Sequence, residues 1–400
     1  MRNDATVIGL ISLAHGMSHF FQLLLAPLFP FIREELGVSY AALGFLVAVF
    51  YALSALLQPL AGFVVDRYGA RSVLLGGIAF FVAGTALMGL SGSYAGLAAG
   101  AALMGIGNSV FHPADFAIIN ARVSAPRLSY AFSAHGVVGY LGYAVAPVFS
   151  VAIAAAYGWH AALLAGAGLG VALLVLLVAH ASYLHIDAQP RKANASFAAD
   201  ARVLFSLPVL LCFLYFTLFA AGLAGLQSFG VSALVEQYKV AATAASSALT
   251  AYLVSAAAGI VVGGFVAARI SRHDLVAASG LAVNALAILL VAMGQVPGLA
   301  LPLAFAIAGF SSGIVAPSRD LIVRASTPKG AAGRVFGFVY SGLDVGSLTM
   351  PVVYGWMLDH ALPHVVCYTV FGFTAAAIAT VLQLSGRSVG VPDAAAVKKA

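Results

Sequence analysis

Long apolar runs return about twelve times along this chain of 400 residues. At roughly 20–28 residues, each run is long enough for a helix to cross the hydrocarbon core of a bilayer. The composition agrees, because 62% of the residues are hydrophobic and only 8% are charged, whereas soluble domains carry about 25% charged residues. A water-soluble fold and a disordered chain are therefore excluded. With Cys212 and Cys367 as its only cysteines, the chain is no disulfide scaffold either.

The apolar runs are continuous rather than alternating, which favours helices over the short alternating strands of a β-barrel. We therefore expect an all-α integral membrane protein with twelve transmembrane helices. The first run is too long for the core of a signal peptide and is taken as the first span. The predicted spans cover residues 5–32, 40–65, 72–91, 94–121, 129–156, 160–184, 204–235, 243–268, 275–294, 299–323, 334–357 and 364–385.

The distribution of basic residues predicts the orientation of these spans, because cytoplasmic loops of membrane proteins are rich in lysine and arginine. With the N-terminus inside, the opposite side holds only Arg33 and Lys239, and Arg319 lies within a span. Both termini are then cytoplasmic, and the net charge of +6 reflects topology rather than nucleic-acid binding. The cytoplasmic residues are Arg2, Arg67, Arg71, Arg122, Arg127, Arg191, Lys192, Arg202, Arg269, Arg272, Arg324, Lys329, Arg334, Arg387, Lys398 and Lys399.

An internal repeat divides the chain near its middle. Sliding the second half onto the first by about 204 residues superposes Pro113 on Pro317 and Pro147 on Pro351, with further matches at phenylalanine and glycine. We therefore expect two parallel-repeat six-helix halves around a central cavity, the plan of one large transporter class. The predicted divisions are an N-terminal half at 1–184, a cytoplasmic linker loop at 185–203, and a C-terminal half with a short cytoplasmic tail at 204–400.

The loop after the second span reads G-F-V-V-D-R-Y-G-A-R from Gly62 to Arg71. It resembles the major facilitator superfamily signature G-x-x-x-D-R-x-G-R-[RK], with Ala70 in place of the first paired basic residue. A basic loop that only sets topology is the alternative. The resemblance implies that Asp66 faces a helix N-terminus and Arg67 pairs with an acid, closing the cytoplasmic side in one state. The predicted gating motif is Gly62, Asp66, Arg67, Gly69 and Arg71.

Within this superfamily the chain is most similar to efflux proteins of the fosmidomycin-resistance type, mainly in its first half. The shared patterns are S-L-x-H at 12–15, L-L-Q-P at 56–59 and F-H-P at 111–113. That family usually follows F-H-P with an acid, where this chain has Ala114 before Asp115, and an expected arginine is Ala117. These departures disfavour fosmidomycin itself as the solute, whereas the resemblance to the superfamily does not depend on them.

Polar side chains at membrane depth form a stripe in each of the first and fourth spans. Ionisable groups inside a span cost several kcal/mol unless they are paired or wetted, which makes them functional candidates. The spacing i, i+4, i+7 places each stripe on one helical face, and the resemblance implies that both spans surround the central cavity. We predict a substrate-binding role for His15, His19, Gln22, Asn108 and His112 and a proton-coupling role for Asp115.

Structural roles remain open for several of these residues. His15 could bond a neighbouring carbonyl, and His112 could satisfy the kink caused by Pro113. Asp115 could instead be a buried partner of Arg122, which lies about two turns away. His15 and His19 have the spacing of metal ligands, but no acid or cysteine accompanies them locally, so we predict no metal site.

The second half carries charges at comparable depth. Arg319 occupies the repeat position of Asp115, Asp320 is expected to point toward Arg324, and Asp344 lies about ten residues into its span. A permanently charged arginine at depth needs an anion, which could be either aspartate or a substrate carboxylate or phosphonate. We predict that Arg319 binds substrate and that Asp344 couples protons, with an internal ion pair as the alternative.

Aromatic residues such as Tyr140, Tyr143 and Tyr340 add apolar surface to the predicted cavity. Packing is the commoner role of such residues, but we include Tyr340 among the substrate-binding residues. A mostly apolar cavity with few charges suits a small amphipathic organic molecule better than a sugar, which needs many hydroxyl partners. The glycines before Pro147 loosely resemble an antiporter motif, yet close helix packing explains them better.

These features indicate a secondary active transporter that works by alternating access, with proton-coupled export of a small organic solute as the preferred mode. Proton-coupled uptake of an organic anion and a non-transporting membrane sensor are the alternatives. No nucleotide-binding loop of the form G-x-x-x-x-G-K-[ST] is present in the sequence, and we expect neither enzymatic activity nor a cofactor. The expected partners are the solute, protons and the lipid bilayer of a bacterial inner membrane, with the protein a monomer.

Overall fold

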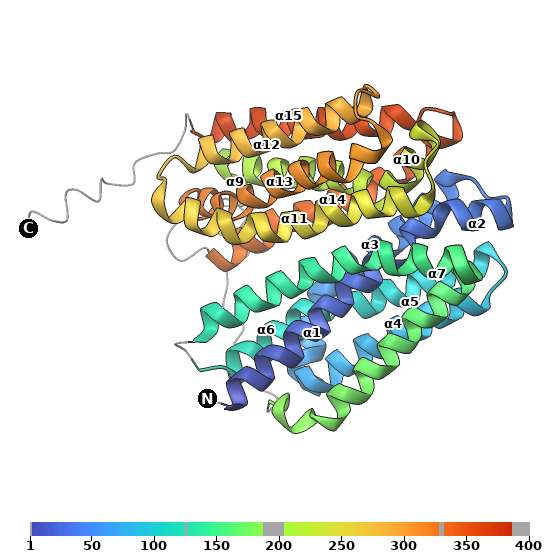
Figure 1. Ribbon diagram of the computed structural model, residues 1–400. Coiled ribbons are helices and arrows are strands. Elements are labelled where there is room, and N and C mark those ends of the chain that lie inside the picture. The colour runs from blue at the N-terminus through green and yellow to red at the C-terminus, as the bar shows by residue number, and fades with distance from the viewer. Residues whose placement is uncertain (1, 125–126, 187–203, 328–331, 386–400) are drawn as a thin grey trace, which may run out of the picture.

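The protein is built from long helices, seen in a computed structural model that describes residues 2–124, 127–186, 204–327 and 332–385 (Figure 1). None of these residues forms a strand. The first half contains α1 (Arg2–Leu24), η1 (Ala26–Leu28), α2 (Phe29–Leu36), α3 (Tyr40–Tyr68), α4 (Ala70–Leu90), α5 (Tyr94–Asn108), α6 (Phe111–Arg122), α7 (Leu128–Ala179) and η3 (Ala181–Tyr183).

The second half repeats the helical pattern (Figure 1). It contains α9 (Leu207–Ala224), η4 (Gly225–Phe229), α10 (Gly230–Tyr238), α11 (Ala242–Arg269), α12 (His273–Ala292), η5 (Gly298–Ala300), α13 (Leu301–Ala325), α14 (Ala332–Asp359) and α15 (Pro363–Ser385). The short η4 is a π-helical turn, a distortion that is frequent at functional sites.

Ten helical segments of the described chain are long and apolar enough to cross a membrane. One of them, within α7, folds back at Gly158, whose φ of 84° and ψ of 162° are not helical, and so supplies two crossings. The helix α14 adds a further crossing of 28 residues. The predicted all-α membrane protein of twelve helices in two six-helix halves is therefore confirmed.

Local sequence explains where individual helices begin and break. The hydroxyl of Ser39 accepts a hydrogen bond from the Ala42 amide at 3.0 Å and caps α3. Gly69 adopts a φ of 82° between α3 and α4, a conformation that favours glycine. The fourth predicted span is interrupted between α5 and α6, just before Pro113, which lacks an amide to bond back into the preceding turn.

The two halves meet tightly at one side of the bundle, here called the closed side, where α2 and α10 lie (Figure 1). The carboxylate of Asp359, at the end of α14, accepts hydrogen bonds from the amides of Tyr40 at 2.7 Å and Ala41 at 2.8 Å, at the start of α3. A Cβ added to Gly44 would overlap the carbonyl of Pro351, so the two helices touch through their backbones. This end of the interface is sealed.

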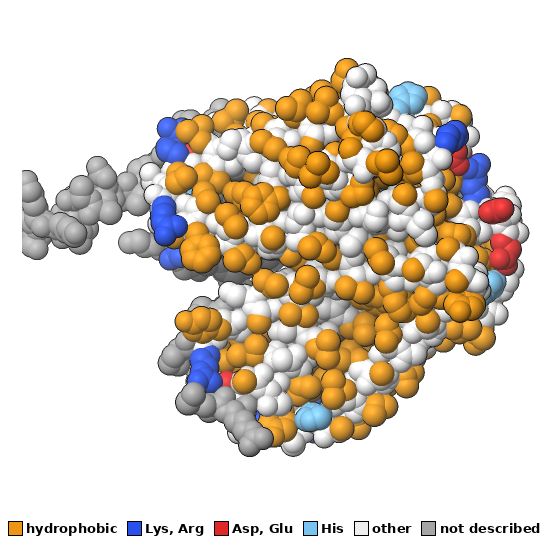
Figure 2. All heavy atoms as spheres, in the orientation of Figure 1, with side chains coloured by type: hydrophobic (Ala, Val, Ile, Leu, Met, Phe, Trp, Pro, Cys, Tyr) orange, Lys and Arg blue, Asp and Glu red, His pale blue; other side chains and the backbone are white. Residues whose placement is uncertain are grey.

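The opposite side, where α1 begins, is here called the open side. Figure 2 shows a notch between the two halves on this side, with the halves in contact toward the closed side. The contacts that join the halves run between α3 and α14 and between α7 and α11. The molecule thus has the shape of a clamp that is shut at one end.

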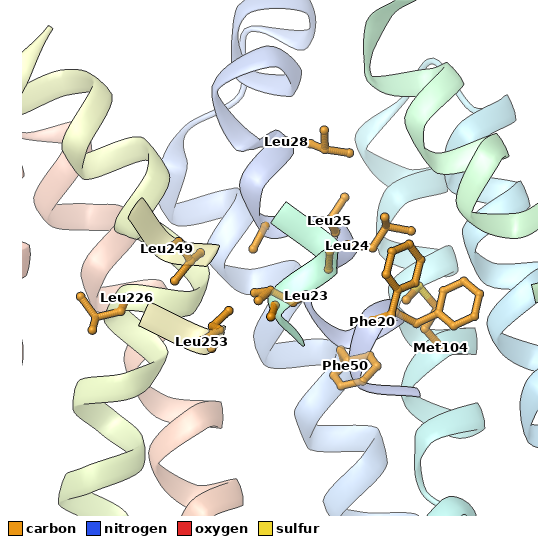
Figure 3. Packing of buried hydrophobic residues seen from close by; sticks show 14 of the residues in the cluster. Phe20, Leu23, Leu24, Leu25, Leu28, Phe50, Met104, Leu226, Leu249 and Leu253 are labelled. Atoms are coloured by element: carbon orange, nitrogen blue, oxygen red, sulfur yellow. The ribbon is translucent and has the colours of Figure 1, made fainter. Parts of the chain in front are cut away.

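One buried apolar cluster continues from the first half into the second (Figure 3). It contains Leu23 from α1 together with Leu226, Leu249 and Leu253 from the second half, each at most 3% exposed. Such a cluster excludes water from the middle of the interface, where an unpaired polar group would be costly.

Candidate functional site

A buried carboxylate forms the polar centre of the first half. Asp115 on α6 is fully buried, and its Oδ2 lies 3.1 Å from Nε2 of His135 on α7 and 3.6 Å from Nδ1 of His15 on α1. The rings of His15 and His135 are stacked, with centroids 3.6 Å apart. All of the partners that the described residues give this carboxylate are imidazoles, so no fixed positive charge holds Asp115 ionised.

Three buried atoms of this centre have no hydrogen-bond partner among the described residues: Nδ1 of His15, Nδ1 of His19 and Oδ1 of Asp115. Buried polar atoms without partners are rare and indicate a place for a proton, a water or an ion. Ligand atoms of His15, Asp115 and His135 lie within 4.8 Å of one another, and transition metals accept such a donor set. The sequence did not reveal this donor set, because the acid and the second imidazole come from other helices.

The remaining histidines lead from this centre toward solvent. His112 is exposed, although its ring centroid lies only 5.4 Å from that of His15. His19 is half-buried and stacks on Tyr143 at 4.2 Å. The expectation that the whole polar stripe faces the cavity is thus wrong for His15 and Asp115, which are sealed between helices. Neither His15 nor Asp115 faces solvent directly, and both connect to the more exposed part of the site through neighbouring side chains.

The two stripes also meet farther along α1. Nε2 of Gln22 donates to Oδ1 of Asn108 at 2.9 Å, and Nδ2 of Asn108 donates to Ser54 at 2.7 Å. The hydroxyl of Tyr143 donates to Oε1 of Gln22. These hydrogen bonds tie the two predicted polar residues to each other and join α1, α3, α5 and α7.

Glycines of α7 make the close approach to α1 possible. A Cβ at Gly139 would lie 2.7 Å from Cδ2 of His15 and 3.0 Å from Nδ1 of His19, and one at Gly142 would overlap the carbonyl of Gly16. These glycines therefore serve helix packing, as small residues commonly do in membranes. They bring the histidines of α1 against His135.

A pocket between the halves lies next to this network. Gln22 lines it from the first half and Gln227 and Ser347 line it from the second, with Tyr51 and Tyr143 beside them. The empty space measures about 320 Å³, part of it open to solvent. Gln227 belongs to the π-helical turn η4, which directs an amide from the second half toward the one from the first.

The half-buried Asp344, on α14, lies close to this pocket. Ser347, one helical turn farther along α14, lines the pocket together with Tyr51 and Tyr143. Arg319 is not among the partners of Asp344. Asp344 thus adjoins the interface between the halves, whereas Asp115 is enclosed within one half.

Arg319 is the polar centre of the second half. Its Nε lies 3.1 Å from Oδ1 of Asp320, which also accepts a hydrogen bond from the Tyr340 hydroxyl at 2.9 Å. The guanidinium lies over the rings of Phe216 at 4.6 Å and Phe219 at 5.9 Å. The anion beside Arg319 is therefore Asp320, not Asp115 or Asp344, and the expected pairing of Asp320 with Arg324 is wrong.

The gating motif is described in part. Gly62 lies within α3, Gly69 joins α3 to α4, Arg67 extends over the ring of Tyr68 at 5.4 Å, and Arg71 is half-exposed. The side chain of Asp66 lies outside the described part of the structure. Among the described residues Arg67 pairs with no acid, as expected where the motif lies on the open side.

Sequence reasoning missed His135 and the role of Asp320. His135 lies next to Gly136 in a small-residue stretch of α7. Its position four residues before Gly139 was the signal that could have found it. The adjacent charges Arg319 and Asp320 were visible, but residues at i and i+1 do not normally face each other on a helix. Their contact depends on the bend of both side chains toward Tyr340.

The molecule consists of two bundles of six membrane helices that share one interface, and each bundle has a polar centre. This is the architecture of a transporter whose two halves rock against each other. The family model of the Major Facilitator Superfamily matches residues 11–232 and again residues 218–397. The chain therefore belongs to this superfamily, as its signature loop indicated.

Individual relatives agree with this assignment. The chain is 26% identical to the fosmidomycin resistance protein of Escherichia coli K12 over 371 residues, which cover 90% of this chain and 88% of that one. It is also 26% identical, over 44% of its length and 32% of the relative, to a tetracenomycin C resistance and export protein of Streptomyces glaucescens. A bacterial homolog of the human lysosomal transporter Spinster, crystallised in an inward-facing and occupied conformation, superposes with a TM-score of 0.80 at 15% identity, covering 96% of this chain and 97% of that one.

Proposed function

We propose that this protein is a secondary active transporter that exports a small amphipathic organic solute from a bacterial cell in exchange for protons. The observation that carries the proposal is Asp115, a buried carboxyl whose partners are imidazoles and which is linked through His15 to the exposed ring of His112. A carboxyl beside neutral bases can gain and lose a proton, whereas a fixed guanidinium would keep it ionised. Relatives named for resistance and export support the outward direction.

The transport cycle follows from the clamp. The basic residues at the ends of α3, α6 and α11 support a cytoplasmic location for the open side and for both termini. Solute enters the notch from the cytoplasm, and rocking of the halves then opens the side closed by Asp359. Asp344, at the interface, serves as the second proton-coupling group, and the protein works as a monomer in the inner membrane.

The residues that touch the solute divide between the two halves in this proposal. His19, His112 and Gln22 meet it from the first half, and Arg319 and Tyr340 meet it from the second. His15 and Asn108 act behind them, because His15 is only 3% exposed and Asn108 is hydrogen bonded to Gln22 and Ser54.

Transport by purified protein in liposomes tests the proposal. Compounds from a panel of drugs, carboxylates and amino-acid derivatives are first selected by their ability to raise the Tm of the full chain. Exchange for protons predicts that a selected compound accumulates inside liposomes with an acidic lumen. Accumulation only when the exterior is acidic would instead mean uptake together with protons, and binding without flux would mean a sensor.

Amide variants of the two acids locate the coupling. Asp115→Asn and Asp344→Asn should each abolish accumulation driven by the proton gradient, while exchange of labelled for unlabelled solute continues. Glu34→Gln is the matched control, because Glu34 is exposed on the closed side and should leave both activities unchanged. If both amide variants still accumulate solute, proton coupling through these groups is wrong. A chelator in every assay separates proton effects from those of a metal bound at His15, Asp115 and His135.

Uptake of an organic anion is the second candidate. Arg319 favours it, since a guanidinium in a membrane helix attracts carboxylates and phosphonates. The same proteoliposome assay distinguishes the two, because export and uptake require opposite proton gradients for accumulation.

A further inference from the structure

Arg319 lines a second pocket, distinct from the one that Gln22 lines. The pocket lies between α9, α11 and α13, and its walls include Tyr140, Tyr215, Phe219, Tyr252 and Ser312. The pocket is partly open to solvent. Three of the four helices that line it belong to the second half, and α7 contributes Tyr140 across the interface.

The helix α13 places one polar face toward this pocket. Ser312, Ala316 and Arg319 all line it and recur at i, i+4 and i+7, which is the spacing of one helical face. Ser312 and Ala316 have small side chains, so Arg319 is the only large side chain that this face of α13 presents to the pocket.

A second, independent observation points to a ligand in this groove. Tyr215 on α9 also lines the pocket, is only 2% exposed, and its hydroxyl has no hydrogen-bond partner among the described residues. A buried hydroxyl without a partner is costly. An acceptor atom bound beside Arg319 would satisfy it.

The ion pair of Arg319 with Asp320 uses only one guanidinium nitrogen. The hydrogen bond to Asp320 is made by Nε, at 3.1 Å, so the edge formed by the two terminal nitrogens has no hydrogen bond to this carboxylate. Asp320 is 41% exposed, so part of its charge is screened by solvent. The internal acid therefore only partly neutralises the guanidinium and competes weakly with an external anion.

We propose that this pocket binds the carboxylate of a small aromatic or apolar monoanion. The terminal nitrogens of Arg319 and the hydroxyl of Tyr215 hold the carboxylate, and the rings of Tyr140, Phe219 and Tyr252 contact the apolar body. Because Arg319 is the one guanidinium that lines the pocket and already pairs with Asp320, the site can hold no more than one further carboxylate. This inference rests on the proposed function and names the class of solute that the transporter carries.

Equilibrium binding to the purified full chain in detergent tests the site with matched probes of equal size. The three probes of equal size are 3-phenylpropionate, its uncharged amide and 3-phenylpropylamine. Benzoate, phenylacetate and 4-phenylbutyrate are added as carboxylates of other lengths. The carboxylates should bind more tightly than the amide and the amine. If none of the carboxylates binds, or if amide and acid bind equally, the proposal is wrong.

Variants of the pocket sharpen the test. Arg319→Gln should weaken binding of the best carboxylate about 100-fold, and Arg319→Lys, which keeps the charge but loses the fork, about 10-fold. Tyr215→Phe should weaken it about fivefold. Arg324→Gln is the matched control, since Arg324 is an exposed arginine on the same helix and should change affinity less than twofold.

The variant Asp320→Asn shows whether Asp320 competes with the solute for Arg319 or holds the guanidinium in position. It removes the internal competitor and should tighten carboxylate binding about fivefold or more. Weaker binding in this variant would show that Asp320 positions the guanidinium, and equal binding in Arg319→Gln and the unmodified protein would overturn the site itself.

The proposed binding site and the proposed transport activity can be overturned independently of each other. Carboxylate binding that depends on Arg319 without any flux in liposomes would overturn transport and leave the site standing. Proton-driven accumulation of a cationic or neutral compound that is unaffected by Arg319→Gln would overturn the site and leave the transporter standing.

Discussion

The polar centres of the two halves occupy equivalent repeat positions, at Asp115 and Arg319, yet their surroundings differ. Asp115 is sealed among His15 and His135, which are 3% and 4% exposed. Arg319 pairs with an acid that is 41% exposed and opens onto a pocket. The two halves thus carry a charged group at equivalent positions but expose it to solvent to different degrees.

This difference suggests that the two polar centres have different roles. A dry carboxyl between imidazoles is suited to hold a small ion such as a proton, because larger ligands cannot reach it. A partly wetted guanidinium with an exchangeable partner is suited to bind a solute. The following experiments, in order of expected effect, test the contrast between a sealed and an open centre.

Loss of His135 should have the largest effect on stability. In His135→Leu the buried carboxyl of Asp115 loses its hydrogen-bond partner, which we expect to cost about 3–5 kcal/mol in free energy of unfolding. The measurement is unfolding in mixed detergent micelles. The double variant Asp115→Leu/His135→Leu should recover most of the loss, and a cost below about 1 kcal/mol for the single variant would contradict a sealed centre.

Crowding the sealed centre should come next. Gly139→Ala places a methyl group 2.7 Å from Cδ2 of His15, which should cost about 1–3 kcal/mol through forced movement of α1. Gly136→Ala is the control from the same helix, because nothing lies within 4 Å of a Cβ there. Equal stabilities of the two variants would mean that α1 and α7 are not packed as described.

The closed side should respond more weakly. Asp359→Asn removes a negative charge from the N-terminus of α3, where it accepts two amide hydrogen bonds, and such a charge contributes about 1 kcal/mol. We expect about a fivefold shift of population toward the form in which this side is open. Accessibility of a cysteine introduced nearby reports the shift, and Glu34→Gln should show none.

The smallest effect is expected at the open centre. Tyr340→Phe removes the hydrogen bond to Asp320, but solvent can replace it because Tyr340 is 36% exposed. The free energy of unfolding should fall by less than about 1 kcal/mol. A loss as large as that of His135→Leu would mean that the two centres are equally dry and would remove the contrast.

The fold followed from the sequence because a bilayer allows few solutions. Long apolar runs must become helices, and the repeat of Pro113 at Pro317 indicated their symmetry. The spacing of His15 and Asp115 placed each on a polar face of its own helix, but the structure buries both between helices and not toward a cavity. Such spacing gives a face but not the helix that packs against it.

The missed parts of the site all depend on neighbouring helices. His135 approaches Asp115 only because Gly139 and Gly142 let α7 lie against α1. Tyr215 meets Arg319 because α9 packs beside α13, although the two are about 100 residues apart. Spacing within a helix contains no information about either contact.

Distances between spin labels across both ends of the clamp test the central claim most directly, namely that two rigid halves rock around a shared interface. One pair joins Tyr130 and Ile270 on the open side, and the other joins Glu34 and Lys239 on the closed side, all of them exposed. We predict that when the pH is changed or a bound solute is added, the first distance shortens while the second lengthens. Two fixed distances, or two that change in the same direction, would contradict alternating access.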